Sequence, residues 1–349
     1  MAHRKNPTVF RALENVNIVV SCEYGQMEQL VGIEDLSVSY YSYRGVVHAL
    51  NGVSLEIGQQ QTVGLVGETG SGKSTIGLAI VGLIPRPGQV DAGKVVMDGE
   101  DLLGKTKNQM RELRRTKLAL IFQDPSTALN PVLRIGDQLA EAFMVKRGVD
   151  KKEAKELTLK TLEEVGITNP KVAQQYPHEL SGGMKQRVMI GMALTGSPEL
   201  LIADEPTSSL DVTLQAQIME LLADLSKKNK MAVLLITHNM GVVSRYCEKV
   251  AVMYAGNIVE SGSTRNVLKF PSHPYTQGLL NAVKLGSKKD LTAIPGTVPD
   301  LINLTGGCSF APRCSHAMEV CRKSKPRLRE IRDGQYAACY LYEEGGETS

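Results

Sequence analysis

The stretch "GETGSGKST", residues 67–75, fits the pattern G-x-x-x-x-G-K-[ST] and lies between an apolar, strand-like run and a helix-like one. Glycines at these positions let the backbone wrap around a phosphate group, with amide N–H groups pointing inward at the start of a helix. Lys73 is then expected to reach the β- and γ-phosphates of a nucleotide, and the Ser74 hydroxyl to bind Mg²⁺. The strand–loop–helix context disfavours the alternative, a glycine-rich loop that only turns a corner. The predicted nucleotide-binding residues are Gly67, Glu68, Thr69, Gly70, Ser71, Gly72, Lys73, Ser74 and Thr75.

A matching acidic pair lies in "LLIADEPTSSLD", residues 200–211. An apolar run ends at Asp204, which places this carboxylate at the C-terminal end of a predicted strand, where α/β sheets bind ligands. Asp204 is expected to hold Mg²⁺, and Glu205 to orient or deprotonate water. The alternative is a strand-end acid that caps the next turn. Gln123 and His238 also end apolar runs, but each is weak evidence alone, because a histidine at a strand end is most often structural.

Apolar strand-like runs alternate with helical patterns along most of the 349 residues. This order is typical of an α/β fold with a mostly parallel sheet. Residues 130–197 interrupt the alternation as a helical insert. Beyond about residue 286, Pro, Gly, Cys and basic residues with little periodicity indicate a small appendage. Residues 1–29 show no clear periodicity and are predicted to be an N-terminal extension, with Met27 as an alternative start.

Composition and charge restrict the class of protein. Lys and Arg number 40 and Asp and Glu 37, giving a net charge of +3, which is too balanced to favour nucleic acid or an anionic membrane surface as a partner. The longest apolar runs fall short of the roughly 20 residues that a membrane span requires. No signal-peptide pattern is evident at the N-terminus. We therefore expect a cytosolic protein, in which cysteines stay reduced or bind metal.

A second glycine-rich segment, "LSGGMKQR" at residues 180–187, places a serine and two glycines at the start of a predicted helix. Such an N-terminus can bind an anion, yet the chain has no second phosphate loop to use it. The alternative is an ordinary serine cap and a flexible turn. In this order, however, the motifs resemble those of the ATP-binding cassette (ABC) ATPase family over residues 30–285. The resemblance implies a RecA-like parallel-sheet core, an antiparallel β subdomain, a helical subdomain at about 130–197, and a small Cys-rich C-terminal extension over 286–349.

The resemblance also implies roles for single residues. Tyr40 would stack on adenine, although Tyr41 and Tyr43 are close enough to leave that role open. Glu205, His238 and Gln123 would act in hydrolysis, with Mg²⁺ held by Ser74, Gln123 and Asp204. The family sandwiches two ATP molecules between two chains, so the second glycine-rich segment would contact a nucleotide held by the other chain. The residues implied at that interface are Ser181, Gly182, Gly183, Gln186 and Asp211.

Within the family, "FQDPSTALNPVLRIGDQL", "HPYTQGLL" and the segment "LSGGMKQR" at residues 180–187, called the signature segment below, look like the D-type ATP-binding subunit of dipeptide/oligopeptide importers. This resemblance implies a partner ATPase (F-type, or a second copy), two permease subunits, an extracytoplasmic solute-binding protein, and a place at the cytoplasmic face of the membrane. The segment around Gln123 and the helical insert would meet the permeases. No nucleic-acid partner is implied. Nickel or oligosaccharide uptake, and a soluble ABC regulator that senses redox state or iron, remain as alternatives.

Four of the six cysteines, Cys308, Cys314, Cys321 and Cys339, fall in the appendage. They lack the short C-x₂₋₄-C pairs typical of zinc sites and the C-x₂-C spacing of common iron–sulfur signatures, so spacing leaves zinc, iron–sulfur and free thiols open. The resemblance implies a [4Fe–4S] cluster, with basic residues such as Arg313 offsetting its charge. A cluster would cross-link a segment too poor in apolar residues to fold alone. As a separate module, the appendage could lose Cys308 without loss of nucleotide binding.

Overall fold

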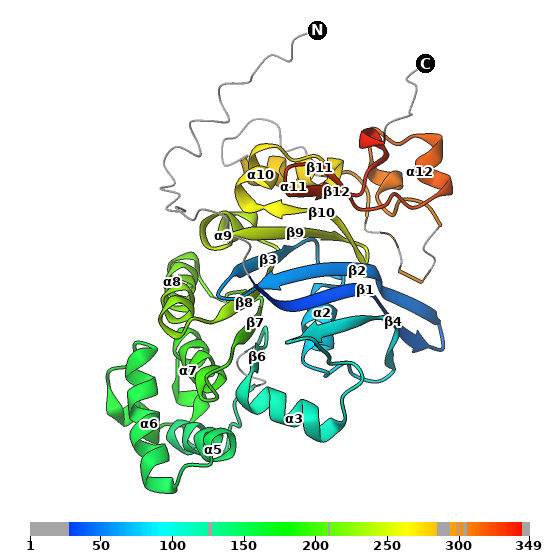
Figure 1. Cartoon of the computed structure of the whole chain (residues 1–349). Coiled ribbons are helices and arrows are strands. Elements are labelled where there is room, and N and C mark those ends of the chain that lie inside the picture. The colour runs from blue at the N-terminus through cyan, green and yellow to red at the C-terminus, as the bar shows by residue number, and fades with distance from the viewer. Residues whose placement is uncertain are drawn as a thin grey trace.

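The computed structural model describes residues 28–124, 128–208, 210–284, 294–297, 299, 301–302 and 306–343. The predicted N-terminal extension lies outside these residues, apart from its last two positions. Two sheets organise the chain (Figure 1). The larger has eight strands in the order β11-β12-β10-β9-β3-β8-β7-β6, and the smaller has four in the order β2-β1-β4-β5.

The eight-stranded sheet is parallel from β6 to β9 and antiparallel beyond it. Its strands are β3 (Thr62–Val66), β6 (Leu118–Ile121), β7 (Leu200–Asp204), β8 (Ala232–Thr237), β9 (Lys249–Tyr254), β10 (Asn257–Ser263), β11 (Arg329–Arg332) and β12 (Gln335–Ala337). Alternate residues of the parallel strands face two different cores. In β7, Leu200 and Ile202 belong to the core shared with the antiparallel sheet, whereas Leu201 and Ala203 belong to the core shared with the later helices. A strand buried on both faces reads as a continuous apolar run, which is why the sequence pattern identified it.

The smaller sheet is antiparallel throughout. It comprises β1 (Gln29–Ser42), β2 (Gly45–Gly58), β4 (Gly88–Met97) and β5 (Glu100–Asp101). Helices α2 (Lys73–Ile80) and α3 (Lys107–Thr116) contribute Ile76, Ile80 and Met110 to the core that this sheet shares with the larger one. The phosphate loop, between β3 and α2, therefore lies next to the core that the two sheets share.

A group of helices lies at the end of the larger sheet that β6 occupies (Figure 1). It contains α5 (Ile135–Arg147), α6 (Lys151–Glu164) and α7 (Gly182–Leu194), all within the predicted insert, and α8 (Val212–Asn229) follows β7. Short α9 (Met240–Tyr246) and α10 (Thr264–Lys269) then lead to α11 (Pro274–Lys284). Among the helices that the structure describes, none combines the length and apolarity needed to cross a membrane.

The C-terminal extension packs onto the larger sheet and extends it. Strand β12 pairs antiparallel with β10, with Glu260 opposite Ala337, and β11 adds the edge strand. The buried side chain of Gln335 donates hydrogen bonds to Glu260 Oε1 (2.8 Å) and the Phe270 carbonyl (2.9 Å). Weak periodicity had suggested an appendage, but the structure shows that its last strands are part of the core sheet. Helix α12 (Glu319–Lys323) completes this region.

Candidate active site

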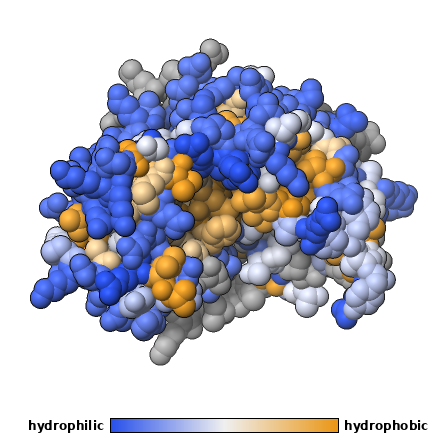
Figure 2. Space-filling model, turned by 90° about the horizontal axis from the view of Figure 1, so that it is seen from below, coloured by the Kyte–Doolittle hydropathy of each residue, from blue (hydrophilic) through white to orange (hydrophobic). Residues whose placement is uncertain are grey.

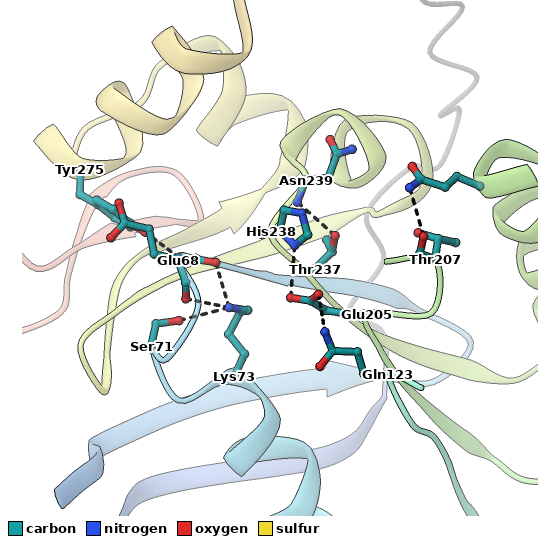
Figure 3. A network of polar contacts seen from close by, with 12 residues as sticks. Glu68, Ser71, Lys73, Gln123, Glu205, Thr207, Thr237, His238, Asn239 and Tyr275 are labelled. Atoms are coloured by element: carbon teal, nitrogen blue, oxygen red, sulfur yellow. Dashed lines mark hydrogen bonds and ion pairs between the residues drawn. The ribbon is translucent and has the colours of Figure 1, made fainter. Parts of the chain in front are cut away.

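The phosphate loop connects β3 to α2 as the sequence pattern predicts. Gly70 and Gly72 have φ angles of 80° and 100°, values that side-chain-bearing residues rarely adopt. The buried Lys73 ammonium donates hydrogen bonds to the carbonyl oxygens of Gly67 (2.8 Å) and Glu68 (2.9 Å), and lies 3.4 Å from Ser71 Oγ (Figure 3). The loop thus curls around the lysine that the sequence assigns to the phosphates. Thr69 and Gly70 are exposed at its tip, and Thr75 is buried in the first turn of α2.

Three carboxylates surround Lys73. Burial lowers the pKa of Lys73, and the charges of Glu205, Asp204 and Glu68 act in the opposite direction. These acids come from the end of β7 and from the loop itself. The predicted phosphate-binding and acidic residues therefore share one site, although Asp204 lies 131 positions after Lys73 in the chain.

Asp204 and Ser74 lie together at the predicted magnesium position. The Ser74 hydroxyl hydrogen-bonds to the Asp204 carboxylate, opposing the burial that raises the pKa of Asp204. The Oδ1 atom of Asp204 is buried and has no hydrogen-bond partner among the described residues. Because Mg²⁺ prefers oxygen ligands, this orphaned carboxylate oxygen beside a hydroxyl fits the ion.

Glu205 lies between two of the other predicted catalytic residues. Its Oε2 accepts a hydrogen bond from Gln123 Nε2 (3.2 Å), and its Oε1 lies 3.2 Å from Nδ1 of His238 (Figure 3). The backbone at Glu205 has a φ of 44°, which is unusual for a non-glycine residue, and its N–H donates to the Ile236 carbonyl (2.9 Å). Gln123 follows β6, Glu205 follows β7 and His238 follows β8, so three neighbouring strand ends converge. Gln123 contacts Glu205 here; the structure shows no bond from it to Asp204.

The signature segment forms the N-terminus of α7. Ser181 caps this helix by accepting a hydrogen bond from the Met184 N–H (3.4 Å), and Ser181 and Gly182 are exposed. Gly183 and Gln186, in contrast to Ser181 and Gly182, lie on the buried face of the helix. Gln186 is 1% exposed and its Nε2 has no hydrogen-bond partner among the described residues. This burial disfavours a direct contact between Gln186 and a nucleotide held by another chain.

Two further predicted positions have local roles within this chain. Asp211 caps α8 and accepts hydrogen bonds from the N–H groups of Thr213 and Leu214, both at 3.0 Å. Tyr40 is half-buried and packs against the core of the antiparallel sheet. Tyr43 is 91% exposed, and Tyr41 donates a hydrogen bond to Asp91 (2.9 Å). Of the three tyrosines, Tyr43 has the most exposed ring, so adenine stacking by Tyr40 stays a prediction.

Sequence reasoning did not find two residues that hold the phosphate loop. Tyr275, at the start of α11, accepts a hydrogen bond from the Glu68 N–H (2.9 Å), and Arg313 forms an ion pair with the Glu68 carboxylate (2.8 Å). The family resemblance instead gives Arg313 the task of offsetting the charge of a cluster. The "HPY" triplet containing Tyr275 was a possible signal, but nothing local placed it beside the loop.

The four cysteines of the extension lie around one small cavity. Backbone N–H groups of His316 and Met318 donate to the sulfurs of Cys314 and Cys321, each at 3.4 Å. Burial raises the pKa of Cys339 to about 11. Within the described residues, no group of three or more His, Cys, Asp or Glu side chains is arranged to hold a metal ion. The residues lining the cavity include Cys308, Cys314, Cys321, Cys339, His273 and His316.

Comparisons with known families agree with this architecture. The family described as "ABC transporter" matches residues 50–208, and the one described as "Oligopeptide/dipeptide transporter, C-terminal region" matches residues 259–321. The second match spans most of β10, the "HPY" triplet and three of the four cysteines. Both the nucleotide site and most of the extension therefore have counterparts in known transport proteins.

Individual relatives cover nearly the whole chain. The oligopeptide transport ATP-binding protein OppD of Escherichia coli is 44% identical over 90% of this chain and 94% of its own length. OppD of Bacillus subtilis is 43% identical over 90% of each chain, and the dipeptide transport ATP-binding protein DppD of that organism is 43% identical over 92% and 97%. Among solved structures, the dimeric post-hydrolysis state of the ATP-binding cassette MJ0796 with ADP and phosphate matches with a TM-score of 0.61 and 27% identity, covering 68% of this chain and 99% of that one. The chain therefore belongs to the ABC transporter family, in the group of ATP-binding proteins that carries the oligopeptide/dipeptide transporter C-terminal region.

Proposed function

We propose that this chain binds ATP with Mg²⁺ and hydrolyses it to drive the uptake of di- or oligopeptides through a membrane transporter. The observation that carries the proposal is the convergence of Lys73, the Ser74–Asp204 pair and Glu205 in one site. The relatives favour peptides over nickel or oligosaccharides, because those compared above are named for oligopeptide or dipeptide transport.

The residues divide the chemistry between them. Loop amides and the Lys73 ammonium bind the phosphates, and Ser74 and Asp204 would hold Mg²⁺, which neutralises charge that develops on the phosphate oxygens. Glu205 accepts a proton from the attacking water. Gln123 and His238 hold the Glu205 carboxylate in place, since each contacts one of its oxygens. This arrangement positions a general base at the γ-phosphate side of the site.

A second ATPase chain completes the site in this proposal. The exposed N-terminus of α7, with Ser181 and Gly182, offers a hydroxyl and backbone N–H groups that no phosphate in the same chain uses. The partner is an F-type ATPase or a second copy of this chain. The γ-phosphate then stabilises the closed pair, and hydrolysis removes that stabilisation.

An apolar hollow supports docking of the permeases. Residues of β6, α5 and α7 line it, together with the ends of α2 and α3, and Leu83 and Phe122 are 42% and 45% exposed there. These elements lie on the lower side of the molecule in Figure 1, and Figure 2, which views it from below, shows apolar side chains gathered in a hollow on that face. A permease helix with an apolar face would bury them. We propose that this face meets two permeases at the cytoplasmic side of the membrane, and that an extracytoplasmic binding protein delivers the peptide.

The cysteines are proposed to hold a [4Fe–4S] cluster. Four thiols line one cavity and match the ligand number of the cluster, although in the described residues their sulfurs are not grouped as metal ligands, so binding would have to draw them together. Backbone N–H groups aimed at two of the sulfurs favour thiolates. Because burial raises the pKa of Cys308, Cys314 and Cys339, these thiols would stay protonated without a positive partner. A bound cluster would cross-link the extension, a structural role that we place before redox control.

Solute-dependent ATP hydrolysis by the purified transporter tests the proposal. The tagged chain is expected to co-purify with the permeases, and the complex to hydrolyse ATP faster when binding protein and a short peptide are added. Ni²⁺ and an oligosaccharide serve as the alternative solutes. Stimulation by either of these, with none by peptides, would overturn the peptide assignment. Purification without permeases would favour the soluble regulator.

A further inference from the structure

The C-terminal extension contacts the phosphate loop through one buried arginine. Nη1 of Arg313 donates to Oε2 of Glu68 at 2.8 Å, and Nη2 donates to Oε1 at 3.3 Å. This two-point contact uses the planar fork of a guanidinium, which lysine cannot reproduce. The Arg313 side chain is only 7% exposed and that of Glu68 26%, so the pair is shielded from solvent. Its partners lie 245 residues apart in the chain.

The remaining donors of Arg313 fix its position. Nε donates to the carbonyl of Pro295 (2.8 Å), and Nη2 also reaches the carbonyl of Ile294 (3.3 Å). Nη1 lies 3.3 Å from the Tyr254 hydroxyl as well. With its donors engaged, the guanidinium has little freedom to leave Glu68. The pair is thus a fixed contact between the extension and the loop.

Three groups of Glu68 are engaged in hydrogen bonds, and one of these bonds comes from Lys73, the lysine expected to bind the phosphates. The Glu68 N–H donates to Tyr275 (2.9 Å), its carboxylate pairs with Arg313, and its carbonyl accepts from Lys73 (2.9 Å). Phe310 packs on Tyr275 with ring centroids 5.5 Å apart, so the extension also supports the second point. A shift of Glu68 would therefore change the surroundings of Lys73.

We propose that Arg313 is a positioning residue for ATP, which neutralises Glu68 and holds it in the geometry that the triphosphate requires. Without Arg313, an unpaired carboxylate would remain in the loop that receives the phosphates and would repel them. The extension thereby sets the affinity of the site. Loss of the cysteines, which include the adjacent Cys314, is then expected to disturb nucleotide binding, unlike the loss of a separate module.

This inference rests on the proposed binding of ATP, and double substitution tests it. The experiment measures the Kd for fluorescent ATP with Mg²⁺, and the KM and kcat for ATP, in the full transporter complex. Arg313→Ala should weaken binding about tenfold, because a like charge is left unpaired beside the phosphates. The added Glu68→Gln change should recover most of that loss, since it removes the charge. A passive structural role for Arg313 would not give this rescue.

The kinetic constants separate positioning from catalysis. Arg313→Ala should raise the KM for ATP while leaving kcat at saturating ATP within about twofold, because Arg313 touches no reacting group. The KM of Arg313→Lys for ATP should lie between those of wild type and Arg313→Ala, since lysine keeps the positive charge but loses the planar fork of the guanidinium. The matched control is Arg327→Ala, an exposed arginine of the same extension with the same change in charge.

Two results would overturn the inference: an Arg313→Ala complex that binds ATP as tightly as wild type, or a double variant that binds no better than Arg313→Ala alone. If Arg313→Ala does not fold, as judged by thermal unfolding, Arg313→Gln decides by the same comparison with and without Glu68→Gln, because glutamine also leaves the Glu68 charge unpaired. Failure of the wild-type complex to bind ATP would instead overturn the proposed function.

Discussion

At the scale of single residues, Glu205 combines two properties expected of a general base. It is oriented by two neighbours, Gln123 and His238, and its side chain is 13% exposed, so bulk water screens it little. Its positive φ angle indicates a backbone held away from its usual preference, which is common at functional sites. Asp204, one residue earlier, is half-buried, and its buried Oδ1 atom has no hydrogen-bond partner in the described part of the chain. Glu205 and Asp204 therefore suit separate roles, because the carboxylate of Glu205 contacts Gln123 and His238 whereas that of Asp204 has a buried oxygen suited to a metal ion.

Replacing Glu205 by Gln should abolish turnover while preserving binding. The substitution keeps the shape of the side chain and removes its ability to accept a proton, so hydrolysis should fall by roughly 10² to 10⁴-fold. The Kd for ATP should change little. Single-turnover hydrolysis and equilibrium binding in the same complex check both parts. Unchanged turnover would remove Glu205 from the mechanism.

Replacing Asp204 by Asn should change both the pH dependence of stability without Mg²⁺ and the stabilisation by MgATP. Burial raises the pKa of Asp204, so its charged form is costly in the folded protein. The stability that a raised pKa confers is present at low pH and lost as pH rises through the folded value. Without Mg²⁺, the wild type should therefore lose stability relative to Asp204→Asn between acidic and neutral pH. Thermal unfolding across pH, with and without MgATP, checks this.

MgATP should stabilise the wild type and have a much smaller effect on the variant, because the metal ligand is missing. A variant that MgATP stabilises as strongly as wild type would show that Asp204 is not the magnesium ligand. An identical pH dependence of the two metal-free proteins would contradict the effect of burial.

At the scale of elements, helix α7 has two tasks at its N-terminus. Ser181 satisfies the Met184 N–H of its own helix, and the proposal also requires it to meet a phosphate of the partner chain. Strand β12 shows a comparable division, because it completes the sheet while Gln335 satisfies the buried Glu260. Each element can be tested by a change that removes one task.

Ser181→Asp and Ser181→Ala distinguish capping from nucleotide contact. Aspartate keeps the N-cap but places a negative charge where the partner's phosphate should lie, whereas alanine loses the cap, at a cost of about 1 kcal/mol of stability. We expect both variants to lose ATPase activity in the dimer, and only Ser181→Ala to unfold at a lower temperature. Activity retained by Ser181→Asp would exclude the proposed contact between chains.

Gln335→Leu should destabilise the chain by about 1–3 kcal/mol, because buried Glu260 loses a hydrogen-bond donor. Denaturant unfolding measures this loss. Asp333→Asn, an exposed change in the β11–β12 turn, is the control and should leave stability unchanged. Equal stability of the two variants would show that β12 contributes little to the sheet.

At the scale of the whole molecule, the sequence predicts those features whose residues lie close together in the chain. The phosphate loop was identified because its glycines and Lys73 lie within nine residues, and Asp204 because it ends a buried strand. Arg313 could not be assigned, since an arginine beside Glu68 is a matter of packing between distant segments. The sequence does not predict strands β11 and β12 because each is short and depends on a neighbour for its pairing: β12 on β10, and β11 on β12.

The cysteine site is a prediction at this same scale, since it joins Cys308, Cys314 and Cys321 to Cys339, which follows strand β12. Anaerobic purification should give about four irons and four sulfides per chain, as a [4Fe–4S] cluster requires. Cys339→Ser should lose the iron and Cys247→Ser, a buried thiol elsewhere, should keep it. Stoichiometric zinc, or no metal, would contradict the cluster.

ATP hydrolysis at this site is proposed to drive peptide import. The most direct measurement is uptake of a labelled short peptide into proteoliposomes that contain the complete transporter with its binding protein, comparing wild type with Glu205→Gln. We predict ATP-dependent accumulation for the wild type and none for Glu205→Gln, with both complexes binding ATP. Equal peptide uptake by the two complexes, or wild-type hydrolysis of ATP without any peptide uptake, would show that hydrolysis at this site does not drive peptide import.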